Sequence, residues 1–171
     1  MKHTGRRQAV KTLLLVGEGD SEEAFLRYLK AIYVSRNSGI AVTIKNAHGK
    51  GAGHVIGVAT RAAHSAAFDK KVALLDTDQD WNARTQEQAK KAKVIVLASE
   101  PCLEASLLRI HQRPVEGLTS EHLKREFRRT FGNPATDPSV YGTHFDRPRL
   151  DAAANGIAFV GSLIRLLQLP W

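Results

Sequence analysis

The sequence Lys71-Val-Ala-Leu-Leu-Asp-Thr-Asp-Gln-Asp-Trp81 joins a short apolar run to three closely spaced acids. Its four apolar residues are typical of a short buried strand. Asp76, Asp78 and Asp80 follow at a spacing of two. Because side chains alternate between the faces of an extended chain, these acids would point the same way and flank one divalent cation. Aspartate is also a favoured turn residue, so a turn that starts at Asp78 is the alternative interpretation.

Three more apolar runs indicate strands, and segments with apolar residues at helical spacing separate them. The expected strands cover residues 12–16, 40–44, 72–75 and 94–98. Strands and helices alternate over the first 110 residues. The sequence therefore predicts an α/β fold, with a four-stranded, mostly parallel sheet flanked by helices and a helical C-terminal tail.

Acidic residues gather where three of these strands end. Nine of the 17 acids lie in three short stretches without Lys or Arg, namely Glu18, Asp20, Glu22 and Glu23, then Asp76, Asp78 and Asp80, then Glu100 and Glu104. Ligands of parallel sheets lie beyond the carboxyl ends of the strands. We therefore expect one edge of the sheet to collect all three stretches. The attraction of acids to helix N-termini is the alternative explanation.

The chain as a whole is strongly basic, with a formal net charge of +8 and a pI near 9.9. Outside the three acidic stretches, the chain has eight acids and 25 Lys and Arg residues. A basic body attracts polyanions, and cations bound at an acidic site allow phosphate to approach it. This distribution favours a nucleic acid partner over a membrane, because no long amphipathic stripe accompanies the charge.

The length is that of one ordinary domain, which we expect to span residues 1–171. Cys102 is the only cysteine, so no disulfide forms within the chain, and a cytoplasmic location is expected. The first apolar run is short and interrupted, which predicts neither a signal peptide nor a transmembrane helix. Residues 1–11 are expected to form a basic arm and residues 112–171 a basic helical extension that packs on the core.

The C-terminal third offers basic residues for substrate contact. A helix over residues 119–130 places Arg128 on its basic side, which is either a solvated face or a phosphate-binding face. Residues 132–149 contain three prolines and are predicted to form a loop that carries Arg147. Asp151 is expected to cap the last helix.

A glycine-rich loop, His48-Gly-Lys-Gly-Ala-Gly-His54, lies between the second and third expected strands. Its glycines and Lys50 suit a phosphate, but the spacing matches neither a P-loop nor a dinucleotide fingerprint. A simple strand-to-helix connection is the alternative. The seven histidines show no zinc-binding spacing, and Cys102 is expected to be a small buried residue rather than a nucleophile.

Three pieces of the chain resemble the RloB-like proteins, a Toprim-related family of bacterial and archaeal defence loci. They are Leu13-Leu-Leu-Val-Gly-Glu-Gly-Asp-Ser-Glu-Glu-Ala-Phe25, Val72-Ala-Leu-Leu-Asp-Thr-Asp78 and Ala98-Ser-Glu-Pro-Cys-Leu-Glu104, in the family's order. The resemblance runs from about Arg6 to the final helix. Its Ser-x-Pro-Cys-x-Glu piece is fairly specific, whereas the strand-end glutamate and the Asp-x-Asp are shared by topoisomerases, primases and OLD-type nucleases.

The resemblance implies a Toprim-like fold and phosphodiester cleavage with two Mg²⁺ or Mn²⁺ ions. The implied catalytic residues are Glu18, Asp76, Asp78 and Glu104. The implied metal ligands are Glu18, Glu22, Asp76, Asp78 and Glu104, with Asp80 as a turn residue or a contributor to the second metal site. The expected substrate contacts are Lys50, Ser99, Arg128 and Arg147. The chain departs from the family's pattern at Glu100, where asparagine is usual, and at Leu103 and Ala105, where bulkier aromatics are common.

Three functions stay open as hypotheses from the sequence. The first is a metal-dependent nuclease that acts on DNA or RNA in defence against phage or mobile DNA. The second is a non-catalytic nucleic-acid- or partner-binding module of the same fold, working beside an ATPase, whose binding depends on salt but not on divalent ions. The third, a small-nucleotide or phosphate-binding protein, depends on the glycine-rich loop. An oligomer is compatible with each.

Overall fold

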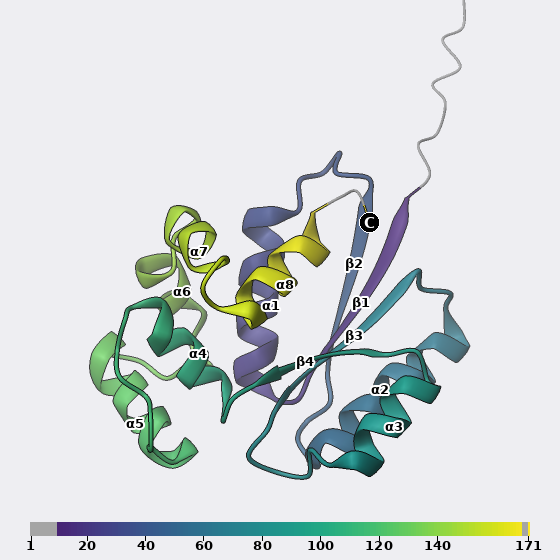
Figure 1. The fold of residues 1–171 in the computed structure, drawn as a ribbon. Coiled ribbons are helices and arrows are strands. Elements are labelled where there is room, and N and C mark those ends of the chain that lie inside the picture. Colours follow the sequence, from purple (N-terminus) through teal and green to yellow (C-terminus); the bar gives the residue numbers. More distant parts are fainter. Residues whose placement is uncertain (1–9, 169–170) are drawn as a thin grey trace, which may run out of the picture.

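The computed structural model describes residues 10–168 and Trp171, and it contains a four-stranded sheet with helices on both faces (Figure 1). The strands are β1 Lys11–Gly17, β2 Ile40–Asn46, β3 Lys70–Asp76 and β4 Ile95–Ser99. The helices are α1 Asp20–Tyr33, α2 Gly51–Ser65, α3 Ala83–Lys91, α4 Leu103–Ile110, α5 Ser120–Phe131, α6 Pro138–His144, α7 Arg147–Ala153 and α8 Ala158–Leu167. The predicted α/β class is confirmed, and the sheet is parallel throughout.

Continuous apolar runs form the central strands because both faces of the sheet are covered. Leu13 and Leu15 of β1 face the larger hydrophobic cluster, which includes side chains of α1, α4 and α8. Leu14 and Val16 point the other way, into a smaller cluster with α2 and α3. All four side chains are completely buried. Alternation of side chains across the strand thus explains why β1 has no polar face.

The strand order β2-β1-β3-β4 creates a switch point between β1 and β3. From β1 the chain passes through α1 to β2 on one side, and from β3 it passes through α3 to β4 on the other. The carboxyl ends of β1 and β3 are therefore neighbours whose connections leave in opposite directions. Open α/β sheets bind ligands at this kind of position.

The predicted loop at residues 132–149 is wrong, because this segment contains α6 and the start of α7. Pro138 and Pro148 lie in the first turns of these helices. A proline is favoured there, since its φ is already helical and its missing N–H would have had no partner in the helix. Asp137 and Asp146 cap the two helices through their side chains. The prolines therefore start helices rather than interrupt them.

The predicted helix cap at Asp151 is also wrong. Asp151 lies inside α7, and the last helix, α8, begins after Ile157. The Asp151 carboxylate instead accepts a hydrogen bond from Tyr33 Oη at 2.7 Å, which joins α7 to the end of α1. Helix α1 has Gly19 at its N-cap.

The C-terminal helices pack on the sheet through the larger hydrophobic cluster. Phe127 of α5, Tyr141 of α6 and Leu163 of α8 belong to the same cluster as β1 and α1. In Figure 1, α4 to α7 gather at one side of the sheet, and α8 lies over it beside α1. Of the predicted basic arm, residues 1–9 lie outside the described residues, and Lys11 begins β1. Among the described residues, no helix is both long and apolar enough to span a bilayer.

Candidate functional site

A pocket at the switch point is lined by five acidic residues from three parts of the chain. Its volume is about 290 Å³. Glu18 follows β1, Asp76 ends β3, and Glu22 and Glu104 belong to the first turns of α1 and α4. We call this cavity, with the carboxylates of Glu18, Glu22, Asp76 and Glu104, the acid pocket. The fifth acid, Asp20, is exposed and accepts a hydrogen bond from Asn46 Nδ2 at 2.7 Å. The structure thus shows the predicted convergence of the three acidic stretches at one edge of the sheet.

Backbone N–H groups hold the carboxylates at the two central strand ends. Glu18 Oε2 accepts a hydrogen bond from Asp76 N at 3.1 Å. Asp76 Oδ1 accepts one from Leu103 N at 3.0 Å. The first bond links the ends of β1 and β3, and the second links β3 to the start of α4. Each carboxylate is therefore positioned by the backbone of the neighbouring segment.

The first turn of α1 brings Glu22 close to the end of β1. Gly19 N donates a hydrogen bond to Glu22 Oε2 at 2.8 Å. A Cβ on Gly17 would lie 2.7 Å from Cβ of Glu22, so this close approach requires glycine at position 17. Glu104 reaches the same turn, where Ser21 Oγ donates to its Oε1 at 3.5 Å. Both glutamates are buried, with exposed fractions of 6% and 4%.

Each carboxylate of the acid pocket uses one oxygen in these contacts. In the described part of the chain, the second oxygen accepts no hydrogen bond from another residue. Carboxylate oxygens of this kind suit Mg²⁺ and Mn²⁺. No three His, Cys, Asp or Glu side chains within residues 10–168 are already grouped so as to hold a metal ion. The donor chemistry fits a divalent cation, and the side chains must rotate to close on one.

Burial and like charge disfavour the ionised carboxylates of the acid pocket. Burial, together with the charges of Glu22 and Glu104, raises the pKa of Asp76 to about 8. Burial raises the pKa of Glu22 to about 7, with a smaller contribution from the neighbouring acids. The pKa of Glu18 is raised as well, chiefly by burial. A bound cation would remove this electrostatic cost, so the pKa shifts agree with a cation site.

Lys124 of α5 also lines the acid pocket, a position that the sequence did not reveal. Burial works to lower the pKa of Lys124, but the carboxylates of Glu104 and Asp76 outweigh it, and the pKa is raised. In the sequence Lys124 is one of four basic residues on one side of a helix. No local pattern distinguishes it from the others, because its position depends on how α5 packs beside the strand ends.

Asp78 and Asp80 lie outside the lining of the acid pocket. The charge of Asp78 is close enough to raise the pKa of both Asp76 and Glu18. Asp80 lies in a turn with a φ of 57°, and its Oδ1 accepts a hydrogen bond from Asn82 Nδ2 at 3.3 Å. Strand β3 ends at Asp76, so the alternation expected of extended chain does not continue through the next two aspartates.

Ser99 ends β4 directly beside Asp76 and is buried, with an exposed fraction of 2%. Its carbonyl accepts a hydrogen bond from Thr77 N at 3.0 Å. The residue does not line the acid pocket. The glycine-rich loop comes close to the same region, since Gly49 N donates to Glu18 O at 2.8 Å.

The three basic residues expected to contact the substrate do not line the acid pocket. Lys50 is exposed before the start of α2, and Arg128 lies in the last turn of α5. Arg147 pairs with Asp151 at 3.6 Å and lies 5.0 Å from the ring centroid of Tyr33. Tyr33 ends the helix whose start forms the pocket, and 14 residues of helix are roughly 20 Å long. The basic residue beside the carboxylates is Lys124.

No protein-family model, curated protein or solved structure matches the chain. The residues of the acid pocket and the charge of the chain are therefore the observations that bear on function.

Proposed function

We propose that this protein is a Mg²⁺- or Mn²⁺-dependent phosphodiesterase that cleaves nucleic acid, related to the Toprim-type RloB-like proteins. The observation that carries the proposal is the acid pocket, a cavity at the switch point that is lined by five acidic residues from three chain segments. Buried acids with raised pKa values are costly to the fold and are typical of functional sites. The net charge of +8 adds attraction for a polyanion. A role in defence rests on the family resemblance.

Glu18, Glu22, Asp76 and Glu104 are the residues that would hold the cation. Bound Mg²⁺ or Mn²⁺ supplies polarisation of a phosphate oxygen and a water of lowered pKa. The hydrogen bonds from Asp76 N and Leu103 N keep one oxygen of Glu18 and of Asp76 engaged, which leaves the other for the ligand. Asp78 is a proposed further ligand, since its charge already acts on two members of the pocket.

Lys124 supplies positive charge from the wall of the pocket. In hydrolysis, water attacks phosphorus and the bond to the leaving ester oxygen breaks, while negative charge accumulates on the phosphate oxygens. An ammonium group next to the carboxylates is able to donate hydrogen bonds to those oxygens. Its raised pKa keeps Lys124 charged at neutral pH. The pocket therefore combines donors for a cation with a cationic donor for the substrate.

Cleavage of labelled single- and double-stranded DNA and RNA, with Mg²⁺, with Mn²⁺ and with a chelator, tests the proposal. We expect cleavage only with a divalent ion, and a loss of at least about 100-fold in Asp76→Asn and Glu18→Gln. Asp80→Asn is the matched control, because Asp80 follows the same strand but lies outside the pocket. Cleavage that survives in both pocket variants would remove these residues from the mechanism.

The same assay separates the nuclease from a non-catalytic binding module. Such a module would bind nucleic acid in a salt-dependent manner, would cleave none, and would bind equally well with Asp76→Asn or without divalent ions. In that case the protein would act together with a partner protein such as an ATPase.

A further inference from the structure

The two edges of the sheet differ in how their outward backbone groups are used. Strands β2 and β4 each pair with one neighbour. At the β2 edge, Lys30 Nζ donates to Val42 O at 2.7 Å, and Ile40 N donates to Ser38 Oγ at 3.4 Å. Contacts of this kind protect an edge from addition of another strand. The β4 edge is not protected in this way within the described part of the chain.

The pairing of β4 with β3 shows which of its groups point outward. Ser99 O accepts a hydrogen bond from Thr77 N, so Ser99 faces β3. Successive residues of a strand direct their backbone groups to opposite sides. The N–H and C=O groups of Val96 and Ala98 therefore point to the open edge, and no described residue bonds to them there.

Both ends of this open segment are closed by the chain itself. Val94 N donates to Ala89 O at 2.9 Å. Glu100 O accepts a hydrogen bond from Arg109 Nη1 at 2.8 Å. On Val96 and Ala98, the two residues between these closed positions, an added strand meets four available backbone groups.

A second copy of β4 satisfies these groups when it runs antiparallel with the two-fold axis at Leu97. Val96 of each copy then lies opposite Ala98 of the other, and each such pair exchanges two hydrogen bonds. All four groups of both chains are used. If the axis moved by one residue, one of the four groups would lie opposite Val94 N or Glu100 O of the other copy. Both of those atoms are already bonded within their own chain.

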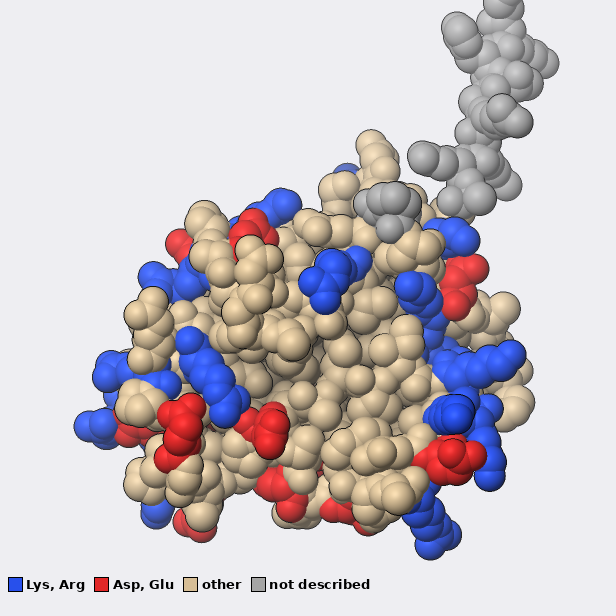
Figure 2. Space-filling model, in the orientation of Figure 1, with Lys and Arg blue, Asp and Glu red and all other residues tan. Residues whose placement is uncertain are grey.

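The charges around β4 suit the same antiparallel arrangement. Figure 2 shows a broad uncharged area in the middle of the face on which β4 lies in Figure 1. Lys70 and Lys93 lie near the amino end of the strand, and the exposed Glu100 follows its carboxyl end. An antiparallel copy places the basic end of one strand against the acidic end of the other.

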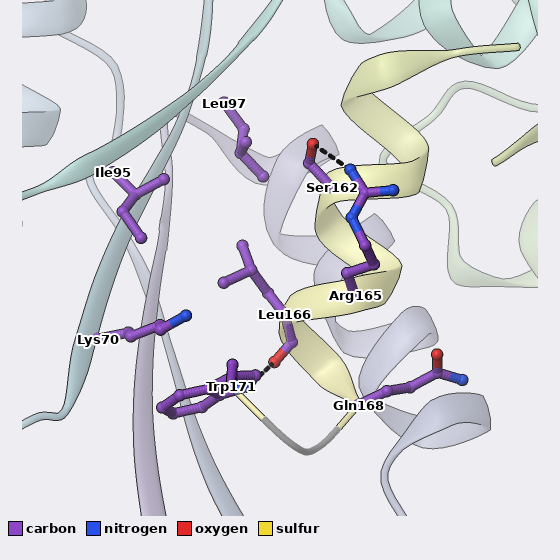
Figure 3. Close-up of a pocket in the computed structure, with 8 residues that line it drawn as sticks. All are labelled: Lys70, Ile95, Leu97, Ser162, Arg165, Leu166, Gln168 and Trp171. Carbon is purple, nitrogen blue, oxygen red and sulfur yellow. Dashed lines mark hydrogen bonds between the residues drawn. The ribbon is translucent and has the colours of Figure 1, made fainter. Parts of the chain in front are cut away.

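Apolar side chains beside the edge are suited to contact a partner. Ile95 is 40% exposed, although it is a large hydrophobic residue. A groove of about 530 Å³ lies between β4 and α8, and Figure 3 shows Ile95 and Leu97 along one side with Leu166 and Trp171 across from them. Opposite residues of an antiparallel pair share a face, so the second copy's Leu97 would lie at this groove.

We propose that two copies of this chain associate through β4, antiparallel and centred on Leu97, to form one eight-stranded sheet. Each acid pocket lies at the carboxyl ends of the strands of its own copy. The strands of the two copies run in opposite directions, so one pocket lies at the upper rim of the joint sheet and the other at the lower rim. The proposal is independent of the proposed nuclease activity.

Disulfide cross-linking tests the register. Cα atoms of a directly opposed, non-hydrogen-bonded pair are about 4.5 Å apart, within the range of a disulfide. We expect Leu97→Cys to form a covalent dimer under mild oxidation. Ile95→Cys is the matched control and should not, because its copies would be displaced by four residues, or about 13 Å. The native Cys102 is buried and does not compete. Equal cross-linking of both variants, or of neither, would overturn the proposal.

Mass measurement by light scattering tests the association itself. The wild type is expected to have twice the mass of one chain. Val96→Pro removes an outward N–H without breaking the ladder to β3, so this variant should be monomeric. Ile44→Pro makes the same change at the outward side of β2 and should stay dimeric. A monomeric wild type, or equal behaviour of the two variants with native circular dichroism, would contradict pairing through β4.

Discussion

The carboxylates of the acid pocket and those of the surface have opposite electrostatic environments. In the pocket, burial and neighbouring acids raise the pKa of Asp76 and Glu22. On the surface, hydrogen bonds from Arg129 lower the pKa of Glu126, whose Oε1 lies 2.8 Å from Arg129 Nη2. Surface acids thus stabilise the fold when ionised, whereas the pocket acids destabilise it. A protein tolerates such a cost where a ligand removes it, and for this reason we propose the pocket as the functional site.

The largest expected effect is that of pH on the metal-free protein. The folded-state pKa values of Asp76 and Glu22, about 8 and 7, lie above their unfolded values of 3.8 and 4.5. The native state therefore binds more protons, and the free energy of unfolding falls as pH rises from about 4 to 8. Asp76→Asn should raise that free energy at pH 8 by about 2 to 4 kcal/mol, because it removes one buried charge.

Urea unfolding in a chelator at pH 5 and pH 8 measures this change. The variant should show a flatter pH profile than the wild type. A wild-type protein that becomes more stable between pH 5 and pH 8 would contradict the assignment of destabilising carboxylates to the pocket.

A smaller effect is expected at Lys124, the lysine that lines the acid pocket. Lys124→Met should lower the free energy of unfolding at pH 8 by about 0.5 to 1 kcal/mol, because the carboxylates lose a partly exposed positive neighbour. The loss should shrink at pH 5, where the acids are protonated. Arg125→Met is the control, since Arg125 is exposed and pairs with Glu121 at 3.6 Å. If both variants lost the same free energy of unfolding, Lys124 would contribute no more than an exposed basic residue does.

The smallest effect is expected at the surface pair. The folded-state pKa of Glu126 is lowered, so its contribution to stability is present above the unfolded pKa and is lost as pH falls below it. Glu126→Gln should therefore change the melting temperature little, and the change should disappear at acid pH. A variant that altered the profile between pH 5 and pH 8 would show that surface acids share the behaviour assigned to the pocket.

The strands and the pocket acids were predictable because they depend on local pattern and on one rule of topology. Apolar runs fix the strands, and a parallel sheet brings its carboxyl ends to one edge, which places Glu18 near Asp76. The predicted alternation of strands and helices over the first 110 residues agrees with the observed order from β1 to α4.

Other features could not be predicted, because they depend on how helices pack or on residues whose pattern fits two structures. Lys124 belongs to the pocket through the position of α5, which no spacing in the sequence encodes. Pro138 and Pro148 have the same sequence signature whether they interrupt a helix or start one, so α6 and α7 were missed. Asp78 and Asp80 depart from the predicted common face because the strand ends before them.

Thermal unfolding with and without Mn²⁺ tests most directly whether the acid pocket binds a divalent cation. A site-specific ion stabilises only the state that binds it, and an ion at 100 times its Kd should raise the wild-type Tm by roughly 5 to 10 °C. Asp76→Asn should show little or no shift, and Asp80→Asn should respond as the wild type does. Equal shifts in wild type and Asp76→Asn, or a wild type that does not respond, would contradict the account.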